Sequence, residues 1–268
     1  ASAGNPKDDT GLERKMESRH LTMISLGGVI GTGLFVSSGY TIHQAGPLGA
    51  ILAYAVGSLL VYCVMVSLGE LSVAMPYAGS FHMYEKRFIG PGTAFTIAIL
   101  YWLNWAVALA SEFTAAGLLM QRWFPHSPSW VWSAVFIVVV FAHGMALAKE
   151  RLIPARFAKT NFRGVPVWAV LFSMAGSLLA LLSSVLAAST VNLVLVAVSG
   201  LATLVVWFSV CVCHIRFRRE WARDGHSADE LDYRAPGFPV LPWLAIVMCI
   251  GALVLVVLDE TQRSTLIA

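Results

Sequence analysis

Charged residues are scarce in this sequence. Asp, Glu, Lys and Arg make up 12% of its 268 residues, whereas soluble domains usually contain about 25%. Hydrophobic residues make up 57%, and they recur in runs of about 20, the length that crosses the hydrocarbon core of a bilayer as a helix. The shortage of charge therefore excludes an ordinary soluble domain and predicts an all-α, polytopic membrane protein.

Enzyme signatures are also missing. The sequence contains no Gly-x-Ser-x-Gly elbow, no His-Glu-x-x-His motif and no phosphate-binding loop. Gly31-x-Gly33 is too short for a dinucleotide-binding fingerprint. The four cysteines fall within apolar runs, where we expect them to be small buried side chains. Cys211-x-Cys213 lacks the spacing and partners of a zinc site. Since these motifs are missing, we expect no enzyme activity, no metal ion and no organic cofactor.

Seven apolar segments are long enough to be membrane spans. Their approximate limits are 21–43, 49–69, 92–119, 129–147, 165–187, 190–213 and 238–258. Sixteen of the 18 basic residues fall in the N-terminal tail and in the connections after the second, fourth and sixth segments, all on one side of the membrane. Basic loops face the cytoplasm, so we expect a cytoplasmic N-terminus. This placement also argues against a nucleic-acid partner, although the net charge is +3.

The predicted spans divide the chain into five parts. We expect a cytoplasmic tail over 1–20, four helices over 21–147, a cytoplasmic amphipathic connection over 148–164, three helices over 165–258 and an extracytoplasmic tail over 259–268. The first 20 residues lack the apolar core of a cleavable signal peptide. Residues 80–88, after the second span, have the pattern of a short amphipathic helix at the membrane surface. The organisation is typical of a multi-pass protein of the cell (inner) membrane.

Five glycines fall between residues 25 and 39, within the first apolar segment. Each weakens a helix by about 1 kcal/mol relative to alanine, so we expect the first helix to be discontinuous. In lipid, a broken helix is tolerated only where the freed N–H and C=O groups line a cavity or bind a ligand. The segment therefore predicts a binding site, whereas Gly27-x-x-x-Gly31 taken alone would equally suit close helix–helix packing.

Glu112 lies in the middle of the third predicted span. A carboxylate is costly inside a membrane and is a functional candidate by default. It could face a cationic group of a substrate or carry a proton, or it could be a protonated acid bonded to a neighbouring helix. Asn104 and Trp105 could line the same face, with Trp105 as a cation–π wall, although such tryptophans are more often packing residues. Glu70 is interpreted as a structural or gating residue that pairs with a basic loop residue.

Several motifs carry a resemblance to a known family. They are His20-Leu-Thr-Met-Ile-Ser-Leu-Gly-Gly-Val-Ile-Gly-Thr-Gly-Leu-Phe, Gln44-Ala-Gly-Pro, Gly69-Glu-Leu-Ser-Val-Ala-Met-Pro-Tyr-Ala-Gly-Ser-Phe, Tyr101-Trp-Leu-Asn-Trp-Ala-Val-Ala-Leu and Leu231-Asp-Tyr-Arg-Ala-Pro-Gly-Phe-Pro. Together they resemble the amino-acid permeases of the amino acid–polyamine–organocation superfamily, in its bacterial amino-acid transporter branch. The resemblance implies a fold of normally twelve spans, with two inverted five-helix repeats and a discontinuous first helix.

This chain is shorter than the family pattern. The sequence from Ala146 to Lys159 resembles the segment after the family's eighth span, although here it comes after the fourth. We therefore expect family spans five to eight to be absent, together with span twelve. About seven transmembrane helices and a partial inverted repeat would remain, without the second discontinuous helix. Removal of four spans keeps alternate loops on the same side, which explains the orderly charge pattern.

The resemblance also assigns roles around the glycines. Gly31, Thr32 and Gly33 would donate backbone N–H groups to a substrate carboxylate, as the positive end of a half-helix favours. Gly28 and Val29 would offer carbonyl oxygens to the substrate ammonium group. The predicted site thus combines these five residues with Asn104, Trp105 and Glu112.

The function that the resemblance implies is secondary active transport of an amino acid across the cytoplasmic membrane, by symport with a proton as in the family relatives. The alternative is an internally deleted, transport-inactive remnant that at most binds an amino acid. The expected partners are an amino-acid substrate, a coupling proton and the lipid bilayer.

Overall fold

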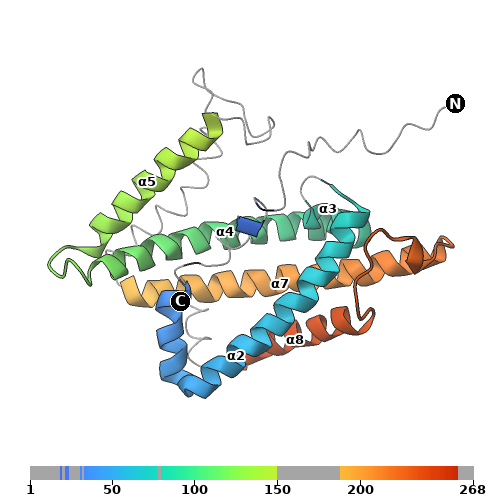
Figure 1. Cartoon of the computed structure of the whole chain (residues 1–268), viewed down its shortest axis with the longest axis horizontal. Coiled ribbons are helices and arrows are strands. Elements are labelled where there is room, and N and C mark those ends of the chain that lie inside the picture. Colours follow the sequence, from blue (N-terminus) through green and yellow to red (C-terminus); the bar gives the residue numbers. More distant parts are fainter. Residues whose placement is uncertain are drawn as a thin grey trace. The chain divides into compact units, whose positions relative to one another are not determined.

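The computed structural model describes residues 19, 22–23, 31, 33–77, 80–149 and 188–258, and their side chains except at 33–37, 141–149, 188–196 and 257. Every regular element within these ranges is a helix (Figure 1), which confirms the all-α fold class. The predicted span at 165–187 and nearly all of the connection at 148–164 lie outside the described residues.

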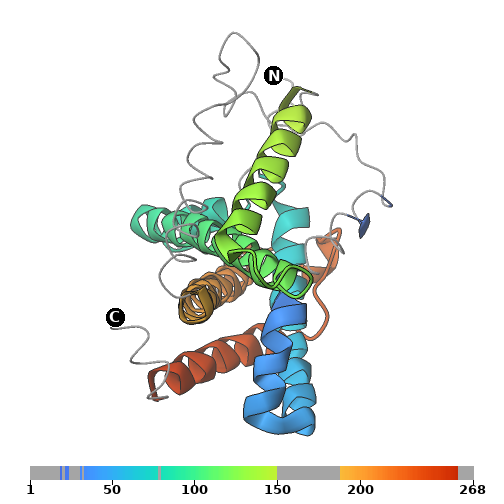
Figure 2. The ribbon, with the colours of Figure 1, turned by 90° about the vertical axis from the view of Figure 1, so that its left-hand side faces the viewer.

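Helix α2 (Gly33–Ala74) is 42 residues long and takes in the end of the first predicted span and all of the second. The expected connection between them is reduced to a sharp change of direction, which Figures 1 and 2 both show. At this corner Gly46 has φ 71° and ψ 171°, a left-handed backbone that glycine adopts without strain. The next residue, Pro47, has no N–H to continue the helical bonding pattern. The two spans therefore meet without a loop.

The next helices follow the predicted segments closely. They are α3 (Phe81–Phe88), α4 (Pro91–Met120) and α5 (Ser129–Lys149). Helix α3 confirms the short amphipathic helix expected after the second span. Tyr84, Glu85 and Phe88 of this helix are buried inside the protein, and its position at a membrane surface stays a prediction.

Helix α7 (Ala188–Arg223) begins close to the predicted span at 190–213 but continues well beyond it. The basic segment that starts at Arg216 is therefore helical, where a cytoplasmic loop was expected. The reason is tertiary packing, since Phe217 and Arg218 are both buried. Burial of one face stabilises a helix whose composition alone would not predict it.

Among the described residues, three helical segments are long and apolar enough to cross a membrane: Ser38–Ala74, Pro91–Met120 and Ala197–Arg223. Shorter apolar helices cover Ser129–Val140 and Val240–Val256. The last belongs to α8 (Val240–Leu258), which follows the 3-10 helix η2 (Ala228–Glu230) and matches the predicted span at 238–258. These apolar helices support a multi-pass membrane protein.

The chain forms two compact units. One includes residues 41–101 and 201–258, and the other includes 31–40, 102–149 and 188–200. In the first unit, side chains of α2, α3, α7 and α8 enclose an apolar core that contains Leu71, Tyr84 and Ile246. All four cysteines are buried in this core as free thiols, which confirms the role expected for them as small buried side chains.

In the second unit, α4 and α5 come into close contact at Gly117. The buried hydroxyl of Ser133 on α5 donates a hydrogen bond of 3.0 Å to the carbonyl oxygen of Phe113 on α4. A Cβ atom on Gly117 would lie 2.6 Å from Ser133 Oγ and 2.7 Å from the carbonyl oxygen of Ser129. The two helices can approach this closely only because residue 117 has no side chain.

The Gly117→Ala variant is expected to lose about 1–3 kcal/mol of unfolding free energy, because the added methyl group meets backbone that cannot rotate away. Thermal unfolding of the chain in detergent measures the difference. Gly92→Ala on the same helix is the matched control, since nothing lies within 4 Å of a Cβ atom at that position. Equal unfolding temperatures for the two variants would contradict the close contact.

Candidate functional site

The structure describes five of the eight residues predicted for the site. They are Gly31, Gly33, Asn104, Trp105 and Glu112. Gly28, Val29 and Thr32 lie outside the described residues, so the roles assigned to them stay predictions. Gly31 is non-helical and α2 begins at Gly33, so a helix N-terminus lies where the substrate carboxylate was expected.

Gly31 and Glu112 are brought together. Glu112 is on α4, and a Cβ atom on Gly31 would lie 2.5 Å from its Oε1 atom. The carboxyl group therefore packs directly against the backbone at Gly31, in the space that any larger residue would occupy. Sequence reasoning selects each of these residues separately, one for backbone freedom and one for a costly charge. Their contact is a finding of the structure.

Asn104 contacts a residue that sequence reasoning misses. Its Oδ1 atom accepts a hydrogen bond of 2.5 Å from the hydroxyl of Ser199 on α7. A serine within an apolar helix forms no recognisable motif, so no signal in the sequence singles out Ser199. The contact fixes which side of the Asn104 amide is the acceptor, so its NH₂ group is directed away from Ser199.

Trp105 has a different environment. Its side chain is 55% exposed, whereas Asn104 beside it in the sequence is half-buried. Successive residues of a helix point in directions about 100° apart, so the two side chains do not share one face of α4. The wall that Trp105 would form around a cation stays a prediction.

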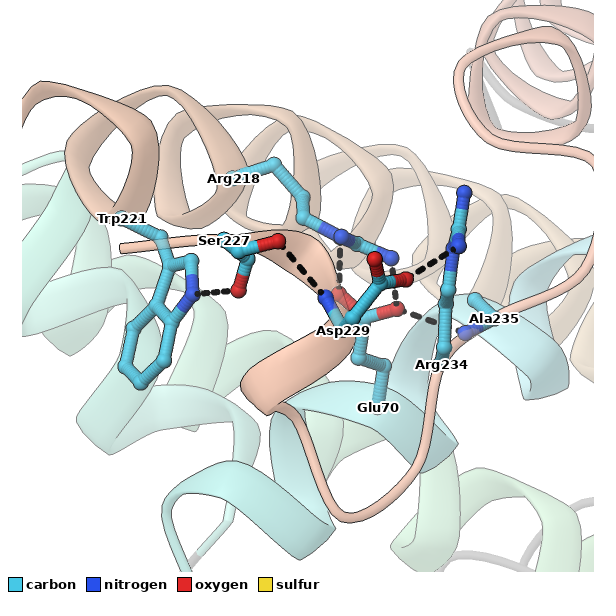
Figure 3. A network of polar contacts seen from close by, with 7 residues as sticks. All are labelled: Glu70, Arg218, Trp221, Ser227, Asp229, Arg234 and Ala235. Atoms are coloured by element: carbon cyan, nitrogen blue, oxygen red, sulfur yellow. Dashed lines mark hydrogen bonds and ion pairs between the residues drawn. The ribbon is translucent and has the colours of Figure 1, made fainter. Parts of the chain in front are cut away.

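A second polar cluster surrounds Glu70, near the end of α2 (Figure 3). Its side chain is completely buried. Arg218 Nη2 donates a hydrogen bond of 2.8 Å to Oε2, and the backbone N–H of Ala235 donates another of 2.6 Å to the same atom. On the other side, Arg218 Nε lies 2.5 Å and His214 Nε2 lies 3.0 Å from Oε1. The expected ion pair of Glu70 is thus present, but its partner is on helix α7 and not in a loop.

The loop after α7 is held in place by its own contacts, which Figure 3 also shows. Trp221 Nε1 donates to the carbonyl oxygen of Ser227 over 2.9 Å, and Arg234 pairs with Asp229 at 2.9 Å. One contact is made at Ser227, the N-cap of η2, and the other at Asp229 within η2. The same loop brings the Ala235 N–H to the Glu70 carboxylate. The cluster therefore joins α2, α7 and the following loop into one polar connection.

The Glu70 cluster has the chemistry of a structural connection. Its one carboxylate is already bound by a guanidinium group and a backbone N–H. Arg218 also lies over the ring of Phe238, 5.0 Å from its centroid, a distance suited to a cation–π contact. Within the described residues, no group of three or more His, Cys, Asp or Glu side chains could hold a metal ion.

The Glu70→Gln variant is expected to lose about 3–5 kcal/mol of unfolding free energy, because it leaves the Arg218 charge buried without a counter-ion. Thermal or denaturant unfolding in detergent measures the loss. The matched control is Glu220→Gln, which breaks the exposed pair with Arg87 at 3.1 Å and should cost less than about 1 kcal/mol. A similar loss in both variants would mean that the buried pair is not a stabilising connection.

Comparison with known proteins places this chain among transporters. The profile of the amino acid permease family matches residues 20–146 and 144–265. A putative histidine permease of Bacillus subtilis is 30% identical over 428 aligned positions, which cover 95% of this chain and 90% of the relative. The lysine-specific permease LysP of Escherichia coli is 53% identical over 131 residues, and the B. subtilis amino-acid permease RocC is 60% identical over 130. No solved structure matches the chain.

These matches also describe how the chain differs from its relatives. The two segments of the family match meet at residues 144–146, and the alignment to the histidine permease is longer than the chain itself. Both facts agree with the expected absence of internal spans after the fourth. The matches to RocC and LysP cover 48% and 49% of this chain but only 28% and 27% of those relatives. The family assignment rests on nearly the whole sequence, and the chain belongs to the amino acid permease family.

Proposed function

We propose that this chain binds an amino acid beside Gly31 and Glu112 and carries it across the cell membrane as a secondary transporter, with a proton as the coupling ion. The observation that supports the proposal is the direct contact between the Glu112 carboxyl group and the backbone at Gly31. Relatives named as permeases of histidine and lysine give the substrate class. We place the N-terminus in the cytoplasm and the chain in the inner membrane, on the distribution of basic residues.

An amino acid has two charged groups, and the proposed site offers a partner for each. The backbone N–H groups of Gly31, Thr32 and Gly33 would bind the carboxylate at the positive end of a half-helix. The ammonium group would contact the carbonyl oxygens of Gly28 and Val29. Glu112 borders the same backbone, so its negative charge would stabilise a cationic group of the substrate.

The same carboxyl group supplies a route for coupling. A carboxylate within an apolar helix is unfavourable unless it is paired or protonated. Symport requires the proton and the amino acid to be bound together, so Glu112 would carry the proton while its neutral carboxyl group hydrogen-bonds to the substrate, and it would pair with a cationic group only in its ionised form. The amide of Asn104, oriented by Ser199 at 2.5 Å, would contribute to the choice among amino acids.

A second candidate function is binding without transport. It is favoured by the alignment to the histidine permease, in which a long internal stretch of the relative has no counterpart in this chain. In permeases built from inverted repeats, the second repeat supplies half of the substrate site and half of the moving parts. A chain without those spans could retain one half-site and lose alternating access.

Uptake of labelled amino acids into proteoliposomes, with and without an inward proton gradient, separates the two functions. Saturable uptake that increases with the gradient supports the proposed symport. Binding of histidine or lysine measured on the purified chain, with no uptake above empty liposomes, supports the binding remnant. Absence of both uptake and binding would contradict both proposals.

The Gly31→Ala variant is expected to bind its amino acid about tenfold more weakly or worse, because the methyl group displaces the Glu112 carboxyl group from the backbone and overpacking costs about 1–3 kcal/mol. Binding isotherms on the purified chain measure the change. The matched control is Gly39→Ala on α2, where nothing lies within 4 Å of an added Cβ atom. Equal affinities for the two variants would remove Gly31 from the site.

The Glu112→Gln variant keeps the shape of the side chain and removes its charge. We expect affinity for the amino acid to fall by roughly tenfold to a hundredfold, because a hydrogen bond to a charged group contributes about 1.5–3 kcal/mol. Any remaining uptake should no longer respond to the proton gradient. Unchanged affinity together with gradient-driven uptake would exclude Glu112 from both binding and coupling.

A further inference from the structure

Glu85 is a buried acid outside the predicted site. It lies on α3, the short helix between α2 and α4, and outside the segments that could span the membrane. Its side chain is completely buried and faces α7, where the hydroxyl of Ser209 contacts its Oε1 atom. The proposed transport mechanism does not use this residue.

Helix α3 is attached to α7 by two further contacts at Phe88, three residues after Glu85. Arg216 Nη1 donates a hydrogen bond of 2.6 Å to the carbonyl oxygen of Phe88. The rings of Phe88 and Phe217 meet edge to face, with centroids 6.0 Å apart. The Glu85–Ser209 contact adds a completely buried carboxyl group to this attachment.

The hydrogen-bond geometry favours the neutral form of Glu85. Ser209 Oγ contacts Glu85 Oε1 and also lies 2.7 Å from the carbonyl oxygen of Val206. A serine hydroxyl has one proton, so Ser209 cannot donate to both oxygens at once, and an ionised Glu85 carboxylate would have to share this single donor with the Val206 carbonyl. Glu85 Oε2 has no hydrogen-bond partner among the described residues, so an ionised carboxylate would be left unsatisfied in the core.

The charged surroundings do not offset ionisation of Glu85. Cys213 on α7 interacts electrostatically with Glu85, and a thiol supplies no positive charge. The other titratable or charged groups near this contact in the sequence of α3 and α7 are His82, Tyr84, Lys86, Arg87, Cys211, His214, Arg216 and Glu220, and the His214 ring contacts Glu70. Just after α2, the backbone carbonyl of Met75 accepts a hydrogen bond from the Tyr84 hydroxyl on α3 over 2.9 Å. Burial raises the pKa of Glu85 to about 7, and the Ser209 hydrogen bond lowers it only in part.

We propose that Glu85 is a proton-binding site that holds α3 against α7 in its neutral form and weakens this attachment when the proton leaves. The site goes beyond the proposed transport function and does not depend on it. It would make the connection between α2 and α4 respond to pH on its side of the membrane.

The direction of the pH effect is set by the two states of the carboxyl group. In the attached state its pKa is about 7, compared with the ordinary 4.5 that it would regain on exposure. The attached state therefore binds more protons, so attachment is strongest at low pH and is lost as the pH rises through 7. Between pH 6 and pH 8 the equilibrium constant for opening should rise about tenfold.

Hydrogen exchange of the full chain in lipid nanodiscs, followed by mass spectrometry at pH 6, 7 and 8, tests the proposal. Rates for peptides covering residues 81–90 are divided by the intrinsic exchange rate at each pH. The wild-type chain should show the tenfold rise, and Glu85→Gln should show none. Glu220→Gln, which removes an exposed carboxylate facing the same helix, should retain the rise. A flat or falling wild-type profile would overturn the proposal, as would a rise that persists in Glu85→Gln.

Ser209→Ala provides an independent variant if the glutamine substitution prevents folding. Removal of the hydroxyl takes away the hydrogen bond that favours the ionised carboxylate, so the rise in exchange should move to higher pH. A role of Ser209 in packing alone would change the exchange rate by the same factor at every pH. An unmoved midpoint in this variant would therefore contradict a proton-binding Glu85.

Discussion

The buried ion pair between Glu70 and Arg218 is the interaction on which the first unit of the structure depends. Both side chains have left water, and the carboxylate is satisfied by the guanidinium group and the Ala235 N–H. Charges in an apolar core are tolerated only while every partner stays in place. The end of α2, the end of α7 and the loop after α7 must therefore keep one arrangement. The apolar core that includes the four cysteines forms between helices held in this way.

Three carboxylates of this chain illustrate how surroundings decide the chemistry of one functional group. Glu70 is paired with the buried guanidinium group of Arg218, and so acts as a fixed charge. Glu85 faces a hydroxyl with a single proton to share, which suits the binding and release of a proton. Glu112 borders a glycine backbone, where a ligand could approach the main chain closely. The proposals for proton sensing and substrate binding rest on these differences in environment.

The lengths of the apolar runs are sufficient to predict α4, α5 and α8, because a run of about 20 residues has to be a helix in a bilayer. The length of an apolar run cannot predict where α7 ends, because the end of this helix is stabilised by the pair between Arg218 and Glu70. These two residues are 148 positions apart in the chain. No sequence pattern singles out Ser199 or Ser209 either, because tertiary packing, and not residue spacing, determines their hydrogen-bond partners. For the candidate site, the sequence identifies Gly31 and Glu112 one by one. It cannot show that they touch.

Two buried acids on other helices bind α7 from opposite sides. Ser209 meets Glu85 of α3 and Arg218 meets Glu70 of α2, and nine residues at about 100° each place these two side chains about half a revolution apart. Insertion of a single residue between them would change that phase by about 100°, so that one contact could form only at the expense of the other. The number of residues in this part of α7 is thus set by angular register, a constraint that hydrophobicity does not impose.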